Sequence, residues 1–515
     1  MTETKRSKKT IRNFFLMIIF TIIVLVSLSI LIPDNLKVSS IIKKNLLFPR
    51  SKIKNDSAMY EVLVETFLGN EQRNYYGEDP PDKMDIIWKL YLGKGKTVIS
   101  RKIGEKEWEG AGWTGQPLLV RESKSLYLIL GAYDHNLKKI DAGTGKVIWQ
   151  YQFDDVVKGT ATIWHNRKSK EKKNRMVILQ GSRLGTGNYL DSRHIPSYRA
   201  ISYFTGEELW RLDVKLTESY SRDADGSALI IDDTAFLGLE NSLFTVFDPD
   251  YKKAEIKDSM LQPKIYQEIR LYEEEDVVSH NNNVVTESSP CKLDDKIYVA
   301  SGSGHVYGYD LIKKQIIWDF FIGSDIDGTT VVTHDSCLLV TIEKQYISGK
   351  GGAFKLDPSK SPENAVVWYF PTENEEYLDW EGGIIGSAGI NDHYNNGEFP
   401  YIAAFIAIDG YLYVVNHMQL EKNKKVAGPD NTKSYPTPVL VFKKYIGPSI
   451  STPVIVDDKL IAPSYDGINL FTYDEEMNFI NIDSLTGSFE STPIVYDEKI
   501  YIASRDGYFY CLGNN

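Results

Sequence analysis

The sequence predicts an all-β fold: an eight-bladed β-propeller of four-stranded antiparallel blades, preceded by one N-terminal transmembrane helix. Three observations support this prediction. Short apolar segments recur at intervals of about 40 residues, which is the length of one blade. A tryptophan-bearing segment recurs beside them, within a chain whose 32 Tyr, 21 Phe and 9 Trp favour β structure. Residues 14–32, ahead of all the repeats, form an uncharged apolar run.

Composition excludes several classes of protein. The 515 residues are 42% hydrophobic and 25% charged, which is enough to build a large core. The net charge of −11 has the wrong sign for binding nucleic acid, so no nucleic-acid partner is expected. The three cysteines, Cys291, Cys337 and Cys511, are widely spaced, which excludes a cysteine zinc site and a c-type haem motif.

The N-terminus predicts a membrane anchor. Residues 1–13 hold five basic side chains and one acidic one, so this tail is expected to stay in the cytoplasm. The nineteen residues 14–32 would reach about 28 Å as a helix and can span a bilayer. A cleaved signal peptide is the alternative. We expect residues 33–83 to be a juxtamembrane linker, and residues 84–515 to be a periplasmic or otherwise extracytoplasmic propeller.

The clearest repeat lies at the C-terminus. Residues 451–467 and 491–507 align with Pro453 and Pro493 40 residues apart. Each copy contains an apolar strand, an acidic turn, a second strand and a Gly turn into a third, which is a β-meander. Weaker copies align on the same anchor position at Pro117, Ala161, Ala228, Pro290, Thr330 and Gly383. The anchors together predict eight blades.

A second repeated element predicts how the ring closes. An outer-strand segment ends at Trp149, Trp210, Trp318 and Trp368, and the same element occurs at Trp88 before any first strand. The last repeat is too short to include its own outer strand. We therefore expect residues 85–91 to supply the outer strand of the last blade.

Residues 141–149 (DAGTGKVIW), with the degenerate 203–210 (YFTGEELW), resemble the D-x-x-T-G-x-x-x-W repeat of the PQQ-like (quinoprotein alcohol dehydrogenase-like) β-propellers. The resemblance covers residues 85–512 and implies an eightfold ring. It also implies that five tryptophans dock neighbouring blades: Trp88, Trp149, Trp210, Trp318 and Trp368.

The enzymes of this family hold the quinone PQQ and calcium on the propeller axis. This chain has no adjacent cysteines and no haem motif, and no Glu, Asn and Asp set aligns with the family's catalytic one. We therefore expect no catalytic residues and no PQQ. A PQQ-dependent dehydrogenase remains the alternative.

Two Asp-x-Asp-Gly sequences stand directly before inner strands. They place Asp223, Asp225, Asp325 and Asp327 on one rim of the channel. Alternating carboxylates with a Gly turn can ligate a hard cation such as calcium, which is the one metal that we consider. The alternative is that these residues only cap turns.

The repeat alignment puts further polar and aromatic residues at the same rim: Trp113, Gln116, Arg222, Glu287, Trp380, Glu381, Ser449 and Glu490. Such a rim could hold a peptide, a glycan or a small ligand, or could simply be a wet channel. The sequence thus favours an exported, membrane-anchored propeller that acts as a non-catalytic binding or scaffolding module, with protein partners in a cell-envelope complex.

Overall fold

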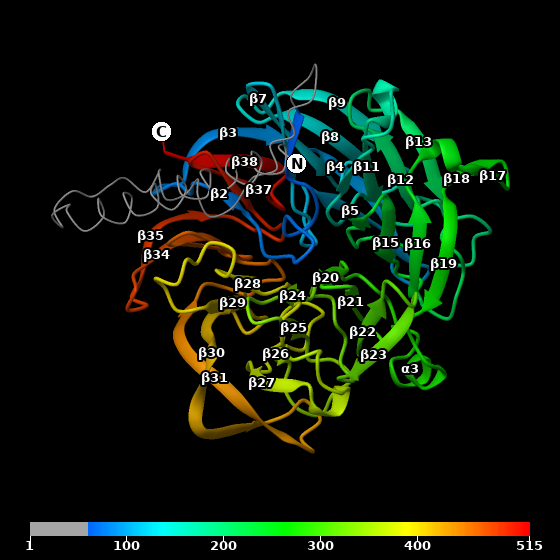
Figure 1. The fold of residues 1–515 in the computed structure, drawn as a ribbon. Helices are drawn as coiled ribbons and strands as arrows, with labels where there is room; N and C mark the ends of the chain where they lie inside the picture. Colours follow the sequence, from blue (N-terminus) through cyan, green and yellow to red (C-terminus); the bar gives the residue numbers. More distant parts are fainter. Residues whose placement is uncertain (1–59, 515) are drawn as a thin grey trace, which may run out of the picture. The chain divides into compact units, whose positions relative to one another are not determined.

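The computed structural model describes residues 60–514, and these form the predicted propeller of eight blades (Figure 1). The predicted cytoplasmic tail and the predicted transmembrane helix lie outside the described residues. Within residues 60–514, no helix combines the length and the apolar character needed to cross a bilayer.

Each blade is an antiparallel sheet, and neighbouring blades follow one another along the chain. The strands of each blade are given from the inner to the outer one. Blade 1 consists of β6 (Leu118–Glu122), β7 (Ser125–Gly131), β8 (Asn136–Asp141) and β9 (Val147–Gln152), and blade 2 of β10 (Thr162–His165), β11 (Met176–Gly181), β12 (Tyr198–Ser202) and β13 (Glu208–Leu212). Blade 3 consists of β14 (Leu229–Ile231), β15 (Thr234–Gly238), β16 (Leu243–Asp248) and β19 (Lys264–Arg270), and blade 4 of β20 (Cys291–Leu293), β21 (Lys296–Ser301), β22 (His305–Asp310) and β23 (Gln315–Phe321).

In the same order, blade 5 consists of β24 (Val331–Val332), β25 (Leu338–Ile342), β26 (Gly352–Leu356) and β27 (Val366–Pro371), and blade 6 of β28 (Gly389–Ile390), β29 (Ile402–Ile406), β30 (Tyr411–Ala427) and β31 (Ser434–Tyr445). Blade 7 consists of β32 (Val454–Val456), β33 (Lys459–Pro463), β34 (Gly467–Tyr473) and β35 (Phe479–Thr486), and blade 8 of β36 (Ile494–Tyr496), β37 (Lys499–Ala503), β38 (Tyr508–Gly513) and β3 (Asp85–Tyr91). Outside the blades lie the hairpins β4 (Lys94–Ser100) with β5 (Gly104–Glu109) and β17 (Glu255–Lys257) with β18 (Met260–Gln262), the helix α3 (Glu274–Ser279), and the 3-10 turns η1 (Lys172–Asn174), η2 (Tyr251–Lys253) and η3 (Pro362–Asn364).

The ring closes as the sequence predicts. Strand β3 pairs antiparallel with β38, so that Trp88 lies opposite Cys511 and Tyr91 opposite Tyr508. The last blade therefore combines three strands from the C-terminus with one from the N-terminus, which leaves the ring without a gap.

The five repeat tryptophans lie at the interfaces between blades. Each indole N–H donates to a backbone carbonyl oxygen of the next blade at 2.9 to 3.0 Å, from Trp88 to Ala142, Trp149 to Tyr203, Trp210 to Pro249, Trp318 to Lys360 and Trp368 to His417. Gly145 has a φ of +71°, and a Cβ added there would lie 2.8 Å from the Trp88 ring. The Gly of the repeat is therefore the surface on which the neighbouring blade's indole rests.

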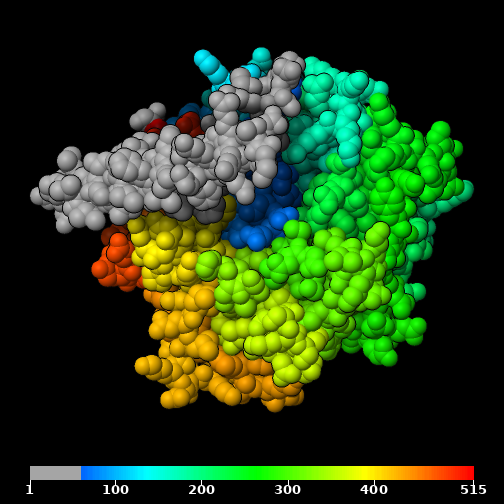
Figure 2. Space-filling model, in the orientation of Figure 1, coloured from blue at the N-terminus to red at the C-terminus, as the bar shows by residue number. Residues whose placement is uncertain are grey.

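The expected linker of residues 33–83 is wrong from residue 60 onward. Strand β1 (Tyr60–Val64) pairs with the inner strand β6 of blade 1, and β2 (Gly77–Glu78) lies parallel to β36 of blade 8. We name residues 65–76, which connect them, the plug. Figure 2 shows these N-terminal residues, in blue, at the centre of the ring between the blades.

The plug is fixed by hydrogen bonds to inner strands all around the channel. Its backbone carbonyls accept from Ile163, Lys292, Val332 and Val495, which belong to blades 2, 4, 5 and 8, at 2.7 to 3.0 Å. The fully buried Arg73 donates to the carbonyl oxygens of Phe67 and Pro290. Because these bonds satisfy polar groups that face the channel, the plug is an integral part of the propeller.

Candidate functional site

One residue from each blade stands three residues before the anchor of the inner strand, and six of these eight residues line a pocket on the propeller axis. We name these eight residues the axial ring: Thr114, Lys158, Asp225, Glu287, Asp327, Ile385, Ile450 and Glu490. Each anchor directly precedes its inner strand, so the anchor of blade 6 is Ala388 and not Gly383, as expected from the sequence. The error arose because Gly383 lies within the long loop that joins β27 to β28.

A belt of hydroxyl groups holds the axial ring in place. Two residues after the ring position, seven of the blades carry Ser or Thr. The backbone N–H of one blade donates to the hydroxyl of the next, as from Ser227 to Ser289, Ser289 to Thr329 and Thr329 to Ser387, each at 2.9 Å. These bonds couple neighbouring blades, so the side chains of the ring project from a rigid support.

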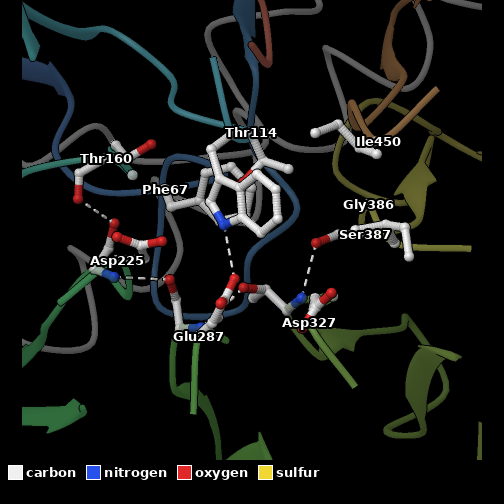
Figure 3. Close-up of a pocket in the computed structure, with 16 residues that line it drawn as sticks. Phe67, Thr114, Thr160, Asp225, Glu287, Asp327, Gly386, Ser387 and Ile450 are labelled. Carbon is white, nitrogen blue, oxygen red and sulfur yellow. Dashed lines mark hydrogen bonds between the residues drawn. The ribbon is translucent and has the colours of Figure 1, made fainter. Parts of the chain in front are cut away.

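The axial ring surrounds a pocket with two unlike sides (Figure 3). Asp225, Glu287 and Asp327 line one side, and Ile385 and Ile450 line the other. The rings of Trp113 and of Phe67, which belongs to the plug, also line the pocket.

The first Asp-x-Asp-Gly turn is neutralised by basic side chains. Asp223 accepts a hydrogen bond from Arg183 Nε at 2.7 Å. Asp225 forms an ion pair with Lys158, whose Nζ also lies 3.7 Å from Glu240. Burial lowers the pKa of Lys158, but the carboxylates of Asp225 and Glu240 outweigh burial and raise this pKa well above its ordinary value. Lys158 therefore carries a firmly held positive charge.

The second turn has no such partner. Asp325 accepts from Asn283 Nδ2 at 2.6 Å through one oxygen, and its other oxygen is buried without a partner. Asp327 is half-buried, and within residues 60–514 its carboxylate has neither a hydrogen bond nor an ion pair. Burial raises the pKa of Asp325 well above its ordinary value, and the nearby carboxylate of Glu343 raises it further.

The four predicted aspartates do not assemble into one metal site. Of the residues that the structure describes, one group of three potential ligands has its oxygens within 4.8 Å of one another: Asp225, Glu240 and Glu287. It includes one of the four, and Lys158 already pairs with Asp225 there. An ammonium group thus lies where a calcium ion would need to bind.

Aromatic side chains form the rim of the pocket. Trp113 has a φ of +50°, which is strained for a bulky residue, and its Nε1 donates to Glu287 at 2.7 Å. The ring of Trp380 lies 6.3 Å from that of Trp113 and 6.5 Å from that of Tyr465, and Tyr377 follows at 5.1 Å from Tyr465. Two of the predicted rim residues, Trp113 and Trp380, are thus brought together.

Three other predicted rim residues, Glu490, Gln116 and Glu381, each contact a different part of the propeller. Glu490 accepts from the backbone N–H of Trp113 at 3.2 Å and pairs with Arg505 at 3.1 Å, so it holds the Trp113 loop. The buried Gln116 joins the plug to blade 8, because it accepts from Leu68 N and donates to Pro493 O. Glu381 is exposed and lies 3.6 Å from Lys344.

Arg222 and Ser449 do not line the pocket, contrary to the prediction. The Arg222 guanidinium is buried and donates to the backbone oxygens of Val214 and Ser192. Ser449 donates to Pro463 O at 2.8 Å. Both side chains instead satisfy buried backbone carbonyls.

The pocket does not suit PQQ. That quinone carries three carboxylates and needs cationic or donor groups around it. The acidic side of the pocket instead presents Asp225, Glu287 and Asp327, with Lys158 already paired. Like charges would face one another, so we derive no reaction step through this cofactor.

The fold and the axial ring define an eight-bladed β-propeller whose channel is closed by its own N-terminal plug. No protein-family model and no curated protein matches the sequence. Among solved structures, the chain is similar to BamB from Moraxella catarrhalis, with 14% identity and a TM-score of 0.51 over 84% of this chain and 100% of that one.

The chain is also similar to the quinohemoprotein alcohol dehydrogenase from Comamonas testosteroni. Here the identity is 11% and the TM-score 0.55, over 88% of this chain and 80% of that one. Both neighbours are PQQ-like propeller repeat proteins, which confirms the family resemblance for the fold. At these identities the similarity shows the fold alone.

Proposed function

We propose that the protein is a membrane-anchored, extracytoplasmic propeller that acts as a non-catalytic binding or scaffolding module in a cell-envelope protein complex. The observation that carries the proposal is the preformed rim of Trp113, Trp380, Tyr377 and Tyr465, which packs against the isoleucines at one side of the acidic axial pocket. Aromatic side chains on a rigid support are typical of surfaces that bind protein partners.

The anchor and the location rest on the N-terminal sequence. The basic tail of residues 1–13 and the apolar run of residues 14–32 favour a single span with the propeller on the exported side. A reporter enzyme that works only outside the cytoplasm, fused to the C-terminus, should be active. Activity of a cytoplasm-dependent reporter at the same position would contradict this topology.

The binding function is tested by isolating the full chain from membranes after cross-linking in intact cells. We expect one or a few envelope proteins to co-purify in a constant ratio to the propeller. Purified protein that stands alone after cross-linking, and that oxidises alcohols with an electron-accepting dye when PQQ and calcium are supplied, would instead favour the quinone-dependent dehydrogenase.

A further inference from the structure

The two walls of the axial pocket match the two parts of a long basic side chain. Ile385 and Ile450, from blades 6 and 7, form an apolar wall, and Glu287 and Asp327, from the adjoining blades 4 and 5, form an acidic wall. Lysine and arginine combine an aliphatic stem with a cationic head, and such side chains lay the stem along apolar surface while the head reaches polar groups. The indole of Trp113 also lines the pocket, and its π-face already attracts a cation, because the Lys158 ammonium group lies 4.9 Å from the ring centre.

The charge around the pocket is unbalanced. Seven carboxylates gather there, and two basic side chains, Lys158 and Arg183, pair with members of the group. The carboxylates are those of Asp223, Asp225, Glu240, Glu287, Asp325, Asp327 and Glu343.

Several carboxylate oxygens of this group lack a donor. Asp327, which lines the pocket and is half-buried, has no hydrogen bond or ion pair among the described residues. The buried Asp225 also lines it but is paired with Lys158, whereas the buried Asp325, in the same turn as Asp327, keeps its Oδ1 without a donor. Buried anions without donors are costly, so an additional cation from outside would be favourable.

Acidic side chains continue beyond the pocket, on a loop at its rim. Residues 373–381 (ENEEYLDWE) hold five carboxylates, and within residues 60–514 the side chains of Glu375, Glu376 and Asp379 have no ion pair. Reciprocal backbone bonds of 3.0 and 3.1 Å between Tyr377 and Trp380 fix the tip of this loop. The tip presents Leu378, which is 69% exposed.

We propose that the axial pocket receives a lysine or arginine side chain from a basic segment of a protein partner, and that the loop of residues 373–381 holds the rest of that segment. The inference rests on the proposed binding function and names the chemistry of the partner. A partner segment fits better than a free amine, because the exposed acidic and apolar surface of the loop continues outside the pocket, where a small ligand would not reach it.

The test uses the full-length protein in detergent and a labelled peptide of alternating lysine and threonine with blocked ends. Fluorescence anisotropy should show saturable binding that weakens with salt. Combining Asp327→Asn with Glu287→Gln should weaken binding by about tenfold or more. Glu255→Gln, an exposed carboxylate in β17, is the matched control and should leave the affinity unchanged.

A second variant tests whether the ligand is an extended segment or a single side chain. Leu378→Ser should weaken the peptide several-fold, yet leave unchanged the weaker binding of N-acetyl-lysine methylamide, which competes for the pocket alone. Equal affinity for the peptide and for this single-residue probe would show that the ligand is a small amine. Calcium binding lost in the Asp327→Asn, Glu287→Gln variant, without peptide binding, would show a metal site. Either result would overturn the proposal, as would peptide binding that the two pocket substitutions do not change.

The cross-linking experiment distinguishes failure of this inference from failure of the proposed function. If the pocket variant keeps every partner of the unaltered protein, the partner binds elsewhere and the pocket inference fails, while the scaffold function stands. If the unaltered protein has no partner, the scaffold function itself fails.

Discussion

The chain uses the Asp-x-Asp-Gly turn twice, before the inner strands of blades 3 and 5, and gives the two copies opposite surroundings. Asp223 and Asp225 lie against Arg183 and Lys158. Asp325 and Asp327 have no basic partner among the described residues, and Asp325 keeps one buried oxygen unpaired. Two turns of the same Asp-x-Asp-Gly pattern thus contribute differently to the channel. The carboxylates of the first are neutralised by basic side chains, and those of the second are not.

This difference separates a structural role from a functional one. Paired carboxylates fasten the loops of blades 2 and 3 to each other, and their charges are satisfied within the chain. The unpaired carboxylates make the folded state less stable than an uncharged turn would, and such a cost is characteristic of binding sites. The comparison yields four predictions.

The largest effect is expected on removing the cation of the first turn. Lys158→Met keeps the length of the side chain but leaves the buried carboxylates of Asp225 and Glu240 without their partner. We expect the free energy of unfolding to fall by about 3 to 5 kcal/mol, measured by urea denaturation.

Lys168→Met is the matched control, because Lys168 also pairs with an aspartate, Asp233, but its side chain is 84% exposed. Its removal should cost about 0 to 1 kcal/mol. Equal effects of the two substitutions would mean that Lys158 does not neutralise the first turn.

The second prediction compares substitutions at corresponding positions of the two turns. We expect them to change the free energy of unfolding in opposite directions. Asp223→Asn breaks the charged hydrogen bond to Arg183 and should destabilise the protein by about 2 to 4 kcal/mol. Asp325→Asn can still accept from Asn283 and removes an unpaired buried acid, so it should stabilise the protein by about 1 to 3 kcal/mol at pH 7. Urea midpoints that shift in the same direction would remove the distinction between the turns.

The sequence predicted the fold closely because the fold depends on repeated local patterns. Anchors directly before inner strands and tryptophans after a Gly turn recur in several blades, and they fixed both the blade number and the closure by residues 85–91. The plug carries no repeat of its own, and its hydrogen bonds connect it to blades that are distant in sequence. Its assignment as a linker followed from that lack of pattern.

The site was predicted only in part, for a related reason. Glu287, Glu490 and Asp327 stand at the ring position, and the same alignment could have found Lys158, three residues before the anchor Ala161. Glu240 and Glu343 follow second strands at positions that no motif marks. Which carboxylates are paired depends on side chains from neighbouring blades, and no single repeat contains that information.

The third prediction concerns pH and Glu287, which stands in the axial ring between the two turns. Burial, and then the nearby carboxylate of Glu240, raise the pKa of Glu287 to about 7 in the folded protein. The folded state therefore keeps a proton that the unfolded chain releases, so stability should fall as the pH rises from about 4.5 to about 7. Glu287→Gln should reduce this loss by about 1 to 2 kcal/mol, measured as urea midpoints at pH 5 and pH 8. An unchanged pH profile would show that Glu287 titrates normally.

The smallest effect is expected from calcium. The sequence places Asp223, Asp225, Asp325 and Asp327 on one rim, but Lys158 and Arg183 already pair with the first two. A ligand that binds only the folded state stabilises it by mass action, and a competing ammonium group weakens such binding. We therefore expect the melting temperature in millimolar calcium to differ from that in chelator by less than about 1 °C. Lys158→Met removes the competitor and should enlarge the difference, whereas Asp225→Ala with Asp327→Ala should abolish it. A shift of several degrees in the unaltered protein, lost in the double alanine variant, would show that the aspartates hold calcium despite Lys158, and that the two turns act together.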